Sequence, residues 1–565
     1  MKEFVLQRDV PMPTRDGVTL RADVYLPSRS GQHPVLLQRT AYGKSAGTSG
    51  AMTNVLRAVD EGYAVVIQDC RGRYSSDGDF VPFHVEVNDG YDSVEWCAAQ
   101  DWSTGRVGMF GTSYVGATQW LAAIAAPPSL RAIFPVMTAA SYHDGWVYQQ
   151  GAFSLAFATA WTAQFLAIPH LNRLALEEGE VAAEEARLMR AIERLRANVS
   201  HRPLQALPML ARDGLASYFY EWFEHPSFDE YWRSVDIASH HDSIAVPAFN
   251  FGSWYDLFIA GPPRNFAGIQ DHGATDAART GQRLIMGPWT HNAPSVAIAG
   301  QRNFGWEATI VLENLQLRWF NRWLKDVDDG LMDEPPIRLY VMNQGWRDEQ
   351  EWPLARTNYA RYYLHSRGRA NSAAGDGTLS FDSPGAEPPD RYLHNPTNPV
   401  PTIGGGGVFD QRSAESRTDM LVYTTAPLRE PVEATGPVTM ELHASTTAVD
   451  TDFVARLVDV HPDGRAENIC DGIVRGRYRD SLEHDGLLEP EKPYAFTIDM
   501  LVTSTVFQPG HRIRLEVASS CFPKFDVNPG TAEPAALAET AVPAVQTVFH
   551  DDVRPSHLLL PVIPS

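Results

Sequence analysis

Residues 106–126 read RVGMFGTSYVGATQWLAAIAA, and this stretch decides the fold. It runs from a short apolar strand through the GTSYVG motif of residues 111–116 into a helix-like segment. A strand that turns sharply into a helix at a serine is typical of a nucleophile elbow, because the bend projects the hydroxyl out of the sheet. Val115 departs from the usual G-x-S-x-G pattern, so a purely structural turn is the alternative. We therefore interpret Ser113 as a candidate nucleophile.

The segments before this motif predict an α/β sheet. Alternating strands occur at VTLRADVYLP and PVLLQRTAY, and a continuous apolar strand runs from Ala64 to Asp69. A helix is predicted over Val87–Ala99, followed by a turn at Asp101–Gly105. Apolar strands that alternate with helical segments indicate a mostly parallel sheet.

The rest of the chain predicts three domains. Residues from about Ser141 to His240 have a helical pattern, plainest in EEGEVAAEEARLMRAIERLRANV, and strands then return at IAVPAFNFG and RLIMGPW. We predict an α/β-hydrolase catalytic domain over residues 1–145 and 241–351, with a helical cap inserted over residues 146–240. Beyond Trp352, short strands separated by Pro, Gly, Asp and Asn predict a C-terminal jelly-roll domain over residues 352–565.

Two further motifs follow predicted strands. Asp256 ends the GSWYD motif after the strand that finishes at Phe251, and His291 ends the GPWTH motif after RLIMG. Taken alone, Asp256 is more simply interpreted as the cap of the helix that follows it. His291 is likewise more simply interpreted as a structural or surface histidine, since the chain has 18 histidines. However, Ser113, Asp256 and His291 occur in the order of an α/β-hydrolase triad. The sequence thus predicts Ser113 as nucleophile, His291 as base and Asp256 as the residue that orients the imidazole.

A triad of this kind needs donors for the oxyanion. One donor is the backbone N–H of the residue after the nucleophile, Tyr114. The second comes from a loop after an early strand, where residues 39–44 read RTAYGK and contain no HGGG-type run. Tyr42 is therefore a candidate whose phenol reaches the oxyanion, with simple packing as the alternative.

Charge and composition exclude several function classes. The net charge of −22 and the isoelectric point near 5.2 disfavour a nucleic-acid partner. The N-terminus lacks the apolar core of a signal peptide, and no stretch is long and apolar enough to be a transmembrane helix. We expect a cytoplasmic protein without a membrane partner and expect its four cysteines to be reduced. The sequence leaves open whether the chain forms a homo-oligomer.

We expect neither a metal nor a cofactor. The run His240-His241-Asp242 is the strongest metal candidate, but it lacks the i, i+4 histidine pair of an H-E-x-x-H helix. It also lies in a polar connection before a strand, which favours a solvated linker. The four glycines 404–407 are expected to form a flexible loop unless a ligand approaches their backbone.

The chain resembles the cocaine-esterase-like hydrolases, which are relatives of the X-Pro dipeptidyl peptidases. The motifs that carry the resemblance are RTAYGK (39–44), QDCRG (68–72), SDG (76–78), GTSYVG (111–116), GSWYD (252–256), GPWTH (287–291), NPTNPVPTIGG (395–405), DTDF (450–453), DVHPDG (459–464), DGIVR (471–475) and PGHR (509–512). The resemblance implies the same three domains, makes the G-x-S-Y-x-G elbow usual, and assigns the oxyanion hole to Tyr42 and the Tyr114 N–H.

The resemblance also implies an acyl pocket. By matching, Phe258, Trp161, Trp146 and Phe409 line it, although each is equally interpreted as ordinary core. Related α-amino-acid ester hydrolases carry an acidic pair after the catalytic aspartate, where this chain has Leu257-Phe258-Ile259. A neutral aromatic or hydrophobic acyl group is therefore expected. Asp144, near the cap, is an argument against this expectation, because its carboxylate favours a cationic group.

These observations predict a serine carboxylic-ester hydrolase that acts on a small-molecule substrate through an acyl-enzyme. An acylase or X-Pro-type dipeptidyl peptidase that cleaves amides is the alternative within enzymes, since the triad chemistry is shared. A ligand-binding jelly-roll protein is the alternative outside enzymes, because a fold does not determine a function.

Overall fold

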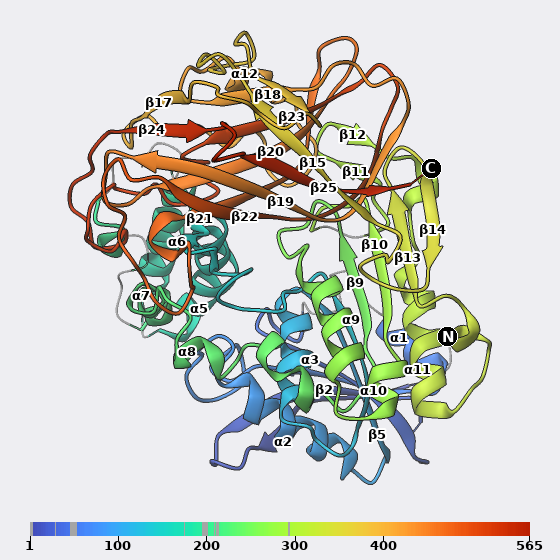
Figure 1. Cartoon of the computed structure of the whole chain (residues 1–565). Coiled ribbons are helices and arrows are strands. Elements are labelled where there is room, and N and C mark those ends of the chain that lie inside the picture. The colour runs from blue at the N-terminus through green and yellow to red at the C-terminus, as the bar shows by residue number, and fades with distance from the viewer. Residues whose placement is uncertain are drawn as a thin grey trace.

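The computed structural model describes residues 4–28, 30–45, 54–174, 176–194, 202–207, 210, 214–291 and 294–564. Figure 1 shows the α/β part of the chain in blue and green in the lower half and on the right, and a group of helices in teal on the left. The C-terminal strands, in orange and red, lie across the top of both.

The first sheet contains ten strands in the order β1-β2-β4-β3-β5-β6-β9-β10-β13-β14. Their bounds are β1 Val5–Pro13, β2 Thr19–Leu26, β3 His33–Thr40, β4 Ala64–Asp69, β5 Ser103–Thr112, β6 Leu130–Val136, β9 Phe249–Ser253, β10 Arg283–Gly287, β13 Ile337–Val341 and β14 Gly345–Glu349. The six neighbouring pairs from β4–β3 to β10–β13 are parallel. The carboxyl ends of these strands therefore meet at one edge of the sheet.

Helices cover both faces of this sheet. On one face, α2 (Glu86–Ala98) and α3 (Tyr114–Ile124) share an apolar cluster with the strands, and on the other face α1 (Val55–Asp60) and α11 (Leu312–Lys325) share a second one. Every residue of β4 is buried, as expected for a parallel strand covered on both sides. Helix α2 agrees with the predicted helix to within one residue, whereas β5 begins at Ser103, inside the predicted turn.

The chain between β6 and β9 is mainly helical in its described part. Its helices are α4 Leu155–Ala160, α5 Ile168–His170, α6 Glu178–Glu193, α7 Ser217–Glu224 and α8 Glu230–Arg233, together with a π-helix over Trp161–Ala167. Helix α6 forms where the amphipathic pattern predicts it and ends at Glu193, and residues 195–199 of that pattern lie outside the described residues. Within the described ranges, no helix has both the length and the apolar character required to cross a bilayer.

The C-terminal part of the chain is an all-β domain, as predicted. Its eleven strands are β15 Asn358–His365, β16 Thr378–Ser380, β17 Asp390–His394, β18 Leu421–Thr424, β19 Val432–Thr446, β20 Asp452–Val460, β21 Ala466–Arg475, β22 Tyr494–Phe507, β23 Arg512–Ala518, β24 Ala544–Phe549 and β25 His557–Ile563. The long strand β19 pairs with β22, β24 and β25, which draws the strands around one apolar core.

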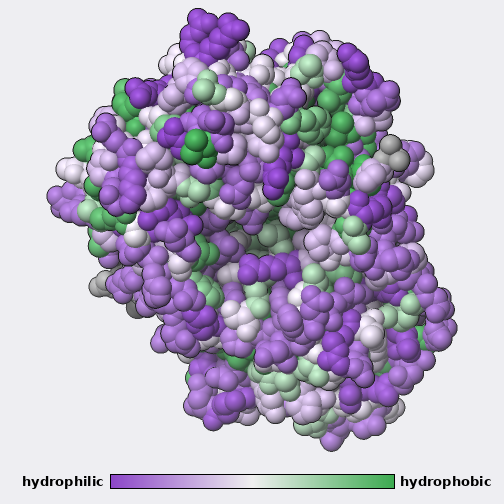
Figure 2. All heavy atoms as spheres, in the orientation of Figure 1, coloured by the Kyte–Doolittle hydropathy of each residue, from purple (hydrophilic) through white to green (hydrophobic). Residues whose placement is uncertain are grey.

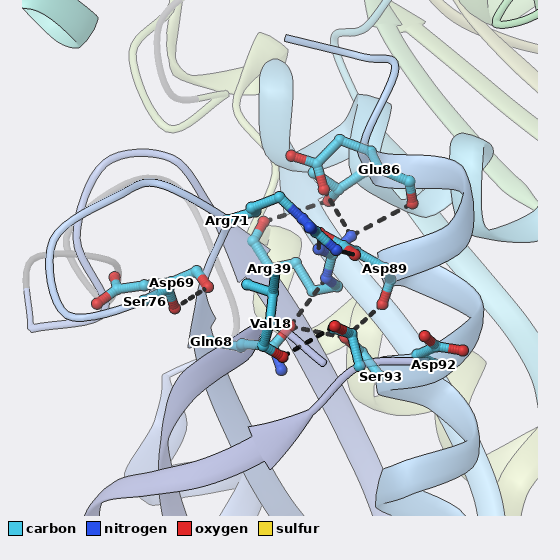
Figure 3. A network of polar contacts seen from close by, with 12 residues as sticks. Val18, Arg39, Gln68, Asp69, Arg71, Ser76, Glu86, Asp89, Asp92 and Ser93 are labelled. Atoms are coloured by element: carbon cyan, nitrogen blue, oxygen red, sulfur yellow. Dashed lines mark hydrogen bonds and ion pairs between the residues drawn. The ribbon is translucent and has the colours of Figure 1, made fainter. Parts of the chain in front are cut away.

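A buried network of charges lies between the sheet and α2 (Figure 3). Arg39, at the end of β3, is 2.6 Å from Glu86 through Nη1 and Oε2, and both side chains are fully buried. Its Nε donates to Gln68 of β4 at 2.9 Å. Arg71 extends the network by donating to Asp89 of α2 at 2.6 and 2.9 Å. Since each buried charge faces an opposite one, the network fixes α2 against the ends of β3 and β4.

We expect Arg39→Met to lower the free energy of unfolding by about 3–5 kcal/mol, because it leaves the buried Glu86 carboxylate without its cation. Guanidinium denaturation followed by tryptophan fluorescence measures this change. The matched control is Arg15→Met, which breaks an ion pair to Asp92 whose arginine is half exposed and is expected to cost less than about 1 kcal/mol. Equal losses in the two variants would contradict a structural role for the network.

Candidate active site

Ser113 stands at the turn between β5 and α3. Its backbone lies in an unusual conformation, with φ 62° and ψ −125°, and its N–H donates to the carbonyl of Val136 at 2.9 Å. The chain is crowded here: a Cβ added to Gly111 would meet Cγ1 of Val115 at 2.1 Å, and one added to Gly116 would meet Thr138 at 3.0 Å. Glycine at both positions therefore permits the sharp bend that presents the serine at the sheet edge.

Asp256 and His291 follow β9 and β10, two neighbouring strands that end at the same edge of the sheet, beyond β6. The Oδ2 atom of Asp256 is 2.6 Å from Nδ1 of His291, and its Oδ1 accepts the N–H of Phe258 at 2.6 Å. A backbone hydrogen bond joins the two segments that carry Asp256 and His291, because the N–H of Trp254 donates to the carbonyl of Gly287. A carboxylate bonded to Nδ1 favours the tautomer in which Nε2 is free to accept a proton.

The environment of His291 shifts its pKa upward. Burial lowers the pKa, but the charge of Asp256 and its hydrogen bond raise it, and these two outweigh burial. Asp256 is itself 5% exposed, so its charge acts on the imidazole with little screening by water. The pair therefore stabilises the imidazolium that forms when His291 takes a proton.

Tyr42 and Tyr114 lie next to Ser113. The Tyr42 hydroxyl accepts a hydrogen bond from the indole of Trp161 at 2.9 Å and shares a side-chain hydrogen bond with Ser113. Tyr114 is the first residue of α3, and its hydroxyl donates to the buried carboxylate of Glu86 at 3.0 Å. Both oxyanion candidates therefore border the elbow, and the charge network of Figure 3 anchors the side chain of one of them.

A cavity of about 1350 Å³ lies where the three parts of the chain meet. Figure 2 shows a hollow near the centre of this face, between the β domain above and the α/β domain below. Asp256 and His291 line it together with Trp146 of the helical part and the four glycines 404–407 of the β domain. The glycine run, expected to be a loop unless a ligand approaches it, thus forms part of the cavity wall.

The predicted pocket residues lie in different surroundings. Phe258 stacks on Trp146 with ring centroids 4.0 Å apart and meets the His291 ring edge-on at 5.3 Å. Trp161 lies behind these rings against Tyr42. Phe409 instead packs against Gly404, where an added Cβ would lie 2.3 Å from its ring, and it is not among the described residues that line the cavity.

Several charged residues line the cavity although no sequence motif predicted them as site residues. Asp499 and Lys524 come from the β domain and Arg264 comes from α9 (Gly261–His272). Lys524 is paired with Asp471 at 2.5 Å. Only the fold brings these segments together, so local patterns could not have indicated them.

Possible metal ligands are engaged in ordinary hydrogen bonds. His241 is buried and bonds to Asn265 at 3.0 Å, and His240 bonds to the carbonyl of Asp236. In the β domain, the ligand atoms of Asp459, His461 and His511 lie within 4.8 Å of one another. However, the nitrogen His461 Nδ1 faces a guanidinium nitrogen of Arg465 at 3.2 Å. A histidine bound to metal through Nε2 carries a proton on Nδ1, which that donor opposes.

The comparisons with known proteins cover nearly the whole chain. The family X-Pro dipeptidyl-peptidase (S15 family) matches residues 16–293, and the X-Pro dipeptidyl-peptidase C-terminal non-catalytic domain matches residues 329–559. Cocaine esterase from Rhodococcus sp. (strain MB1 Bresler) is 40% identical over 578 residues, covering 99% of both chains.

Two solved structures share the complete architecture. An aminopeptidase from the marine sediment archaeon Thaumarchaeota archaeon aligns with a TM-score of 0.82 at 26% identity, covering 99% of this chain and 96% of that one. An α-amino acid ester hydrolase aligns with a TM-score of 0.78 at 26% identity, covering 99% of this chain and 97% of that one.

The fold and these relatives define a serine hydrolase of the α/β-hydrolase class with a C-terminal all-β domain. The chain belongs to the S15 family of X-Pro dipeptidyl-peptidases and is similar to cocaine esterase from end to end, which confirms the resemblance expected from its motifs. The relatives named as esterases support its assignment as a carboxylic ester hydrolase.

Adding one methyl group to Gly111 tests whether the turn at Ser113 requires glycine at this position. Gly111→Ala places a Cβ against Val115 and is expected to reduce the folded, active fraction severely, because a core clash of this kind costs about 1–3 kcal/mol and more where the backbone cannot move. Thermal unfolding and the rate of serine labelling by a fluorophosphonate measure the two effects. The control is Gly105→Ala, also at positive φ, where an added Cβ would have no described atom within 4 Å apart from its neighbours in the chain. Equal behaviour of the two variants would show that crowding at the elbow is unimportant.

Proposed function

We propose that the chain hydrolyses small carboxylic esters through an acyl-enzyme formed on Ser113, with His291 as base and Asp256 as the orienting acid. The observation that carries the proposal is the 2.6 Å bond between Asp256 and His291 at the strand edge that also presents Ser113. A free serine is a weak nucleophile, so a neighbouring base oriented by a carboxylate supplies the activation that it needs.

The reaction follows from these roles. Ser113 Oγ forms a bond to the carbonyl carbon of the ester while its proton passes to Nε2 of His291. The negative charge that develops on the carbonyl oxygen is stabilised by the N–H of Tyr114 and the hydroxyl of Tyr42. The tetrahedral intermediate then breaks its bond to the alcohol, which leaves with the proton from His291, and water releases the acid by the same steps in reverse.

We propose that the acyl group is neutral and aromatic or hydrophobic. The support is the stack of Trp146 on Phe258 beside His291, since aromatic rings offer an apolar contact surface at the point where an acyl group would enter. The residues after Asp256 are Leu257, Phe258 and Ile259, which provide no charge for an ammonium group. Cleavage of amides is the second candidate, because the family name and the archaeal aminopeptidase both denote peptide-bond hydrolysis.

Hydrolysis of p-nitrophenyl esters with different acyl groups, beside the matching anilides and a Gly-Pro anilide, tests the proposal. We expect benzoyl and medium aliphatic esters to be turned over much faster than the anilides, and Ser113→Ala to lower kcat by at least about 10⁴-fold. Anilide turnover equal to ester turnover would move the assignment to an acylase or peptidase. Activity that persists in Ser113→Ala would reject the nucleophile.

The pH profile provides a separate test of the Asp256–His291 pair. Only neutral His291 accepts a proton, so kcat/KM should rise with pH through a pKa above the ordinary histidine value. Asp256→Asn removes the charge that raises this pKa, so the acid limb should move to lower pH and kcat should fall by about 10⁴-fold. Asp242→Asn, which removes an exposed carboxylate of the same domain, serves as the control for loss of one charge. An unshifted acid limb in Asp256→Asn would contradict the assignment.

A further inference from the structure

Tyr42 is held from behind by two side chains to which the mechanism above gives no role. The indole Nε1 of Trp161 donates to the Tyr42 hydroxyl at 2.9 Å, and the guanidinium of Arg73 donates through Nε to the carbonyl of Ala41 at 2.9 Å. One contact acts on the reactive hydroxyl and the other on the backbone directly before it.

The Trp161 ring has little freedom to move. It is 5% exposed and is the first residue of the π-helix Trp161–Ala167, an uncommon element that is frequent at functional sites. The rings within 6.3 Å of its centroid are those of Phe83, Tyr114, Trp146, Phe157 and Trp222. The N–H that meets Tyr42 is therefore fixed in direction by packing.

This bond decides where the Tyr42 proton points. A tyrosine hydroxyl has one proton to donate and lone pairs to accept with, and an indole nitrogen only donates. Because Trp161 supplies the donor, Tyr42 must be the acceptor in that bond, and its own proton is free for a different acceptor. A hydroxyl that accepts one hydrogen bond is also polarised toward donating another.

Arg73 brings a buried positive charge close to the same group. Arg73 is 2% exposed. Its Nη1 donates to the carbonyl of Leu166 at 2.9 Å and its Nη2 to the carbonyl of Phe165 at 3.3 Å, and both carbonyls belong to the π-helix. Among the described residues it takes part in no ion pair within 4.0 Å, and its guanidinium lies over the ring of Phe80 at 5.2 Å. A charge without a counter-ion in a poorly solvated site acts strongly on its neighbours.

The pKa of the Tyr42 hydroxyl reflects the contacts with Trp161 and Arg73. Burial raises the pKa of Tyr42 well above its usual value, while the hydrogen bond from Trp161, the charge of Arg73 and the bond with Ser113 oppose that rise. Trp161 and Arg73 thus both favour negative charge at or beside the Tyr42 oxygen.

We infer that Trp161 and Arg73 are positioning residues which aim the Tyr42 hydroxyl at the oxyanion and increase its strength as a donor. The inference rests on the proposed oxyanion role of Tyr42. Trp161 is then part of the catalytic apparatus behind Tyr42 and acts through it, in addition to any contact with an acyl group. Arg73 joins the Tyr42 loop to the π-helix Trp161–Ala167, so the position of that helix is coupled to the position of Tyr42.

A double-mutant cycle tests the role of Trp161. We expect Tyr42→Phe to lower kcat on a p-nitrophenyl ester by about 10²-fold, and Trp161→Phe to lower it about tenfold with little change in KM. In the Tyr42→Phe background, Trp161→Phe should lower kcat by no more than about twofold, because its effect passes through the hydroxyl. Inhibition by a boronic acid, whose tetrahedral adduct places an oxygen in the oxyanion hole, should weaken in parallel with kcat.

Equal effects of Trp161→Phe in both backgrounds would overturn the inference, since Trp161 would then act on substrate or on the fold. If Tyr42→Phe leaves kcat unchanged, the oxyanion role of Tyr42 fails and the inference fails with it. The Ser113→Ala control is unaffected by either result, so the nucleophile is tested separately.

Arg73 is tested by removing its charge. We expect Arg73→Met to lower kcat about tenfold in the native background and at most about twofold with Tyr42→Phe, whereas Arg73→Lys, which keeps the charge, stays within about threefold of the native enzyme. Arg73→Lys also provides the comparison if Arg73→Met does not fold. The control is Arg173→Met, because Arg173 likewise donates to backbone carbonyls, those of Tyr74 and Ser76, but has no hydrogen bond to residues 41–45, the described start of the Tyr42 loop. A loss in Arg73→Lys equal to that in Trp161→Phe would overturn the role of the charge.

Discussion

The left-handed backbone of Ser113 is the constraint on which the site depends. A residue with a side chain adopts φ 62° only where the surroundings hold it there, and here Ser113 lies between β5 and α3 with its N–H bonded to the carbonyl of Val136 at the end of β6. Glycine at 111 and 116 removes the atoms that would block the turn. Once the turn exists, the serine, the N–H of Tyr114 and the start of α3 all take their positions from it.

The groups around this turn are held by a buried layer of charge and aromatic rings. Glu86 bonds to the Tyr114 hydroxyl and is paired with Arg39, so the elbow is tied to the end of β3, three residues before Tyr42. Arg73 holds the same loop from the other side. Charges that are buried and paired, or bonded to carbonyls, resist displacement because water cannot replace their partners. These contacts hold Tyr42 and Tyr114, the residues proposed for the oxyanion hole, in place without a contribution from substrate.

The cavity has a different origin from the elbow. Its walls come from the α/β domain, the helical segment and the β domain, and the four glycines 404–407 bring β-domain backbone up to the residue beside His291. Under the proposed function, substrate preference is a property of the assembled chain, whereas the proposed catalytic residues all lie at the sheet edge. This separation explains how relatives named as esterase, aminopeptidase and amino acid ester hydrolase share one architecture.

The sequence by itself predicted the strand, turn and helix around Ser113, the strand ends that carry Asp256 and His291, and the all-β C-terminal part. These features follow from local periodicity, glycine placement and the order of motifs along the chain. Tertiary structure decided the rest. Trp161 meets Tyr42 across 119 residues, while Phe409 packs against Gly404 and is not among the described residues that line the cavity. Local patterns are silent on such contacts because they depend on how distant segments pack, and packing is a property of the whole fold.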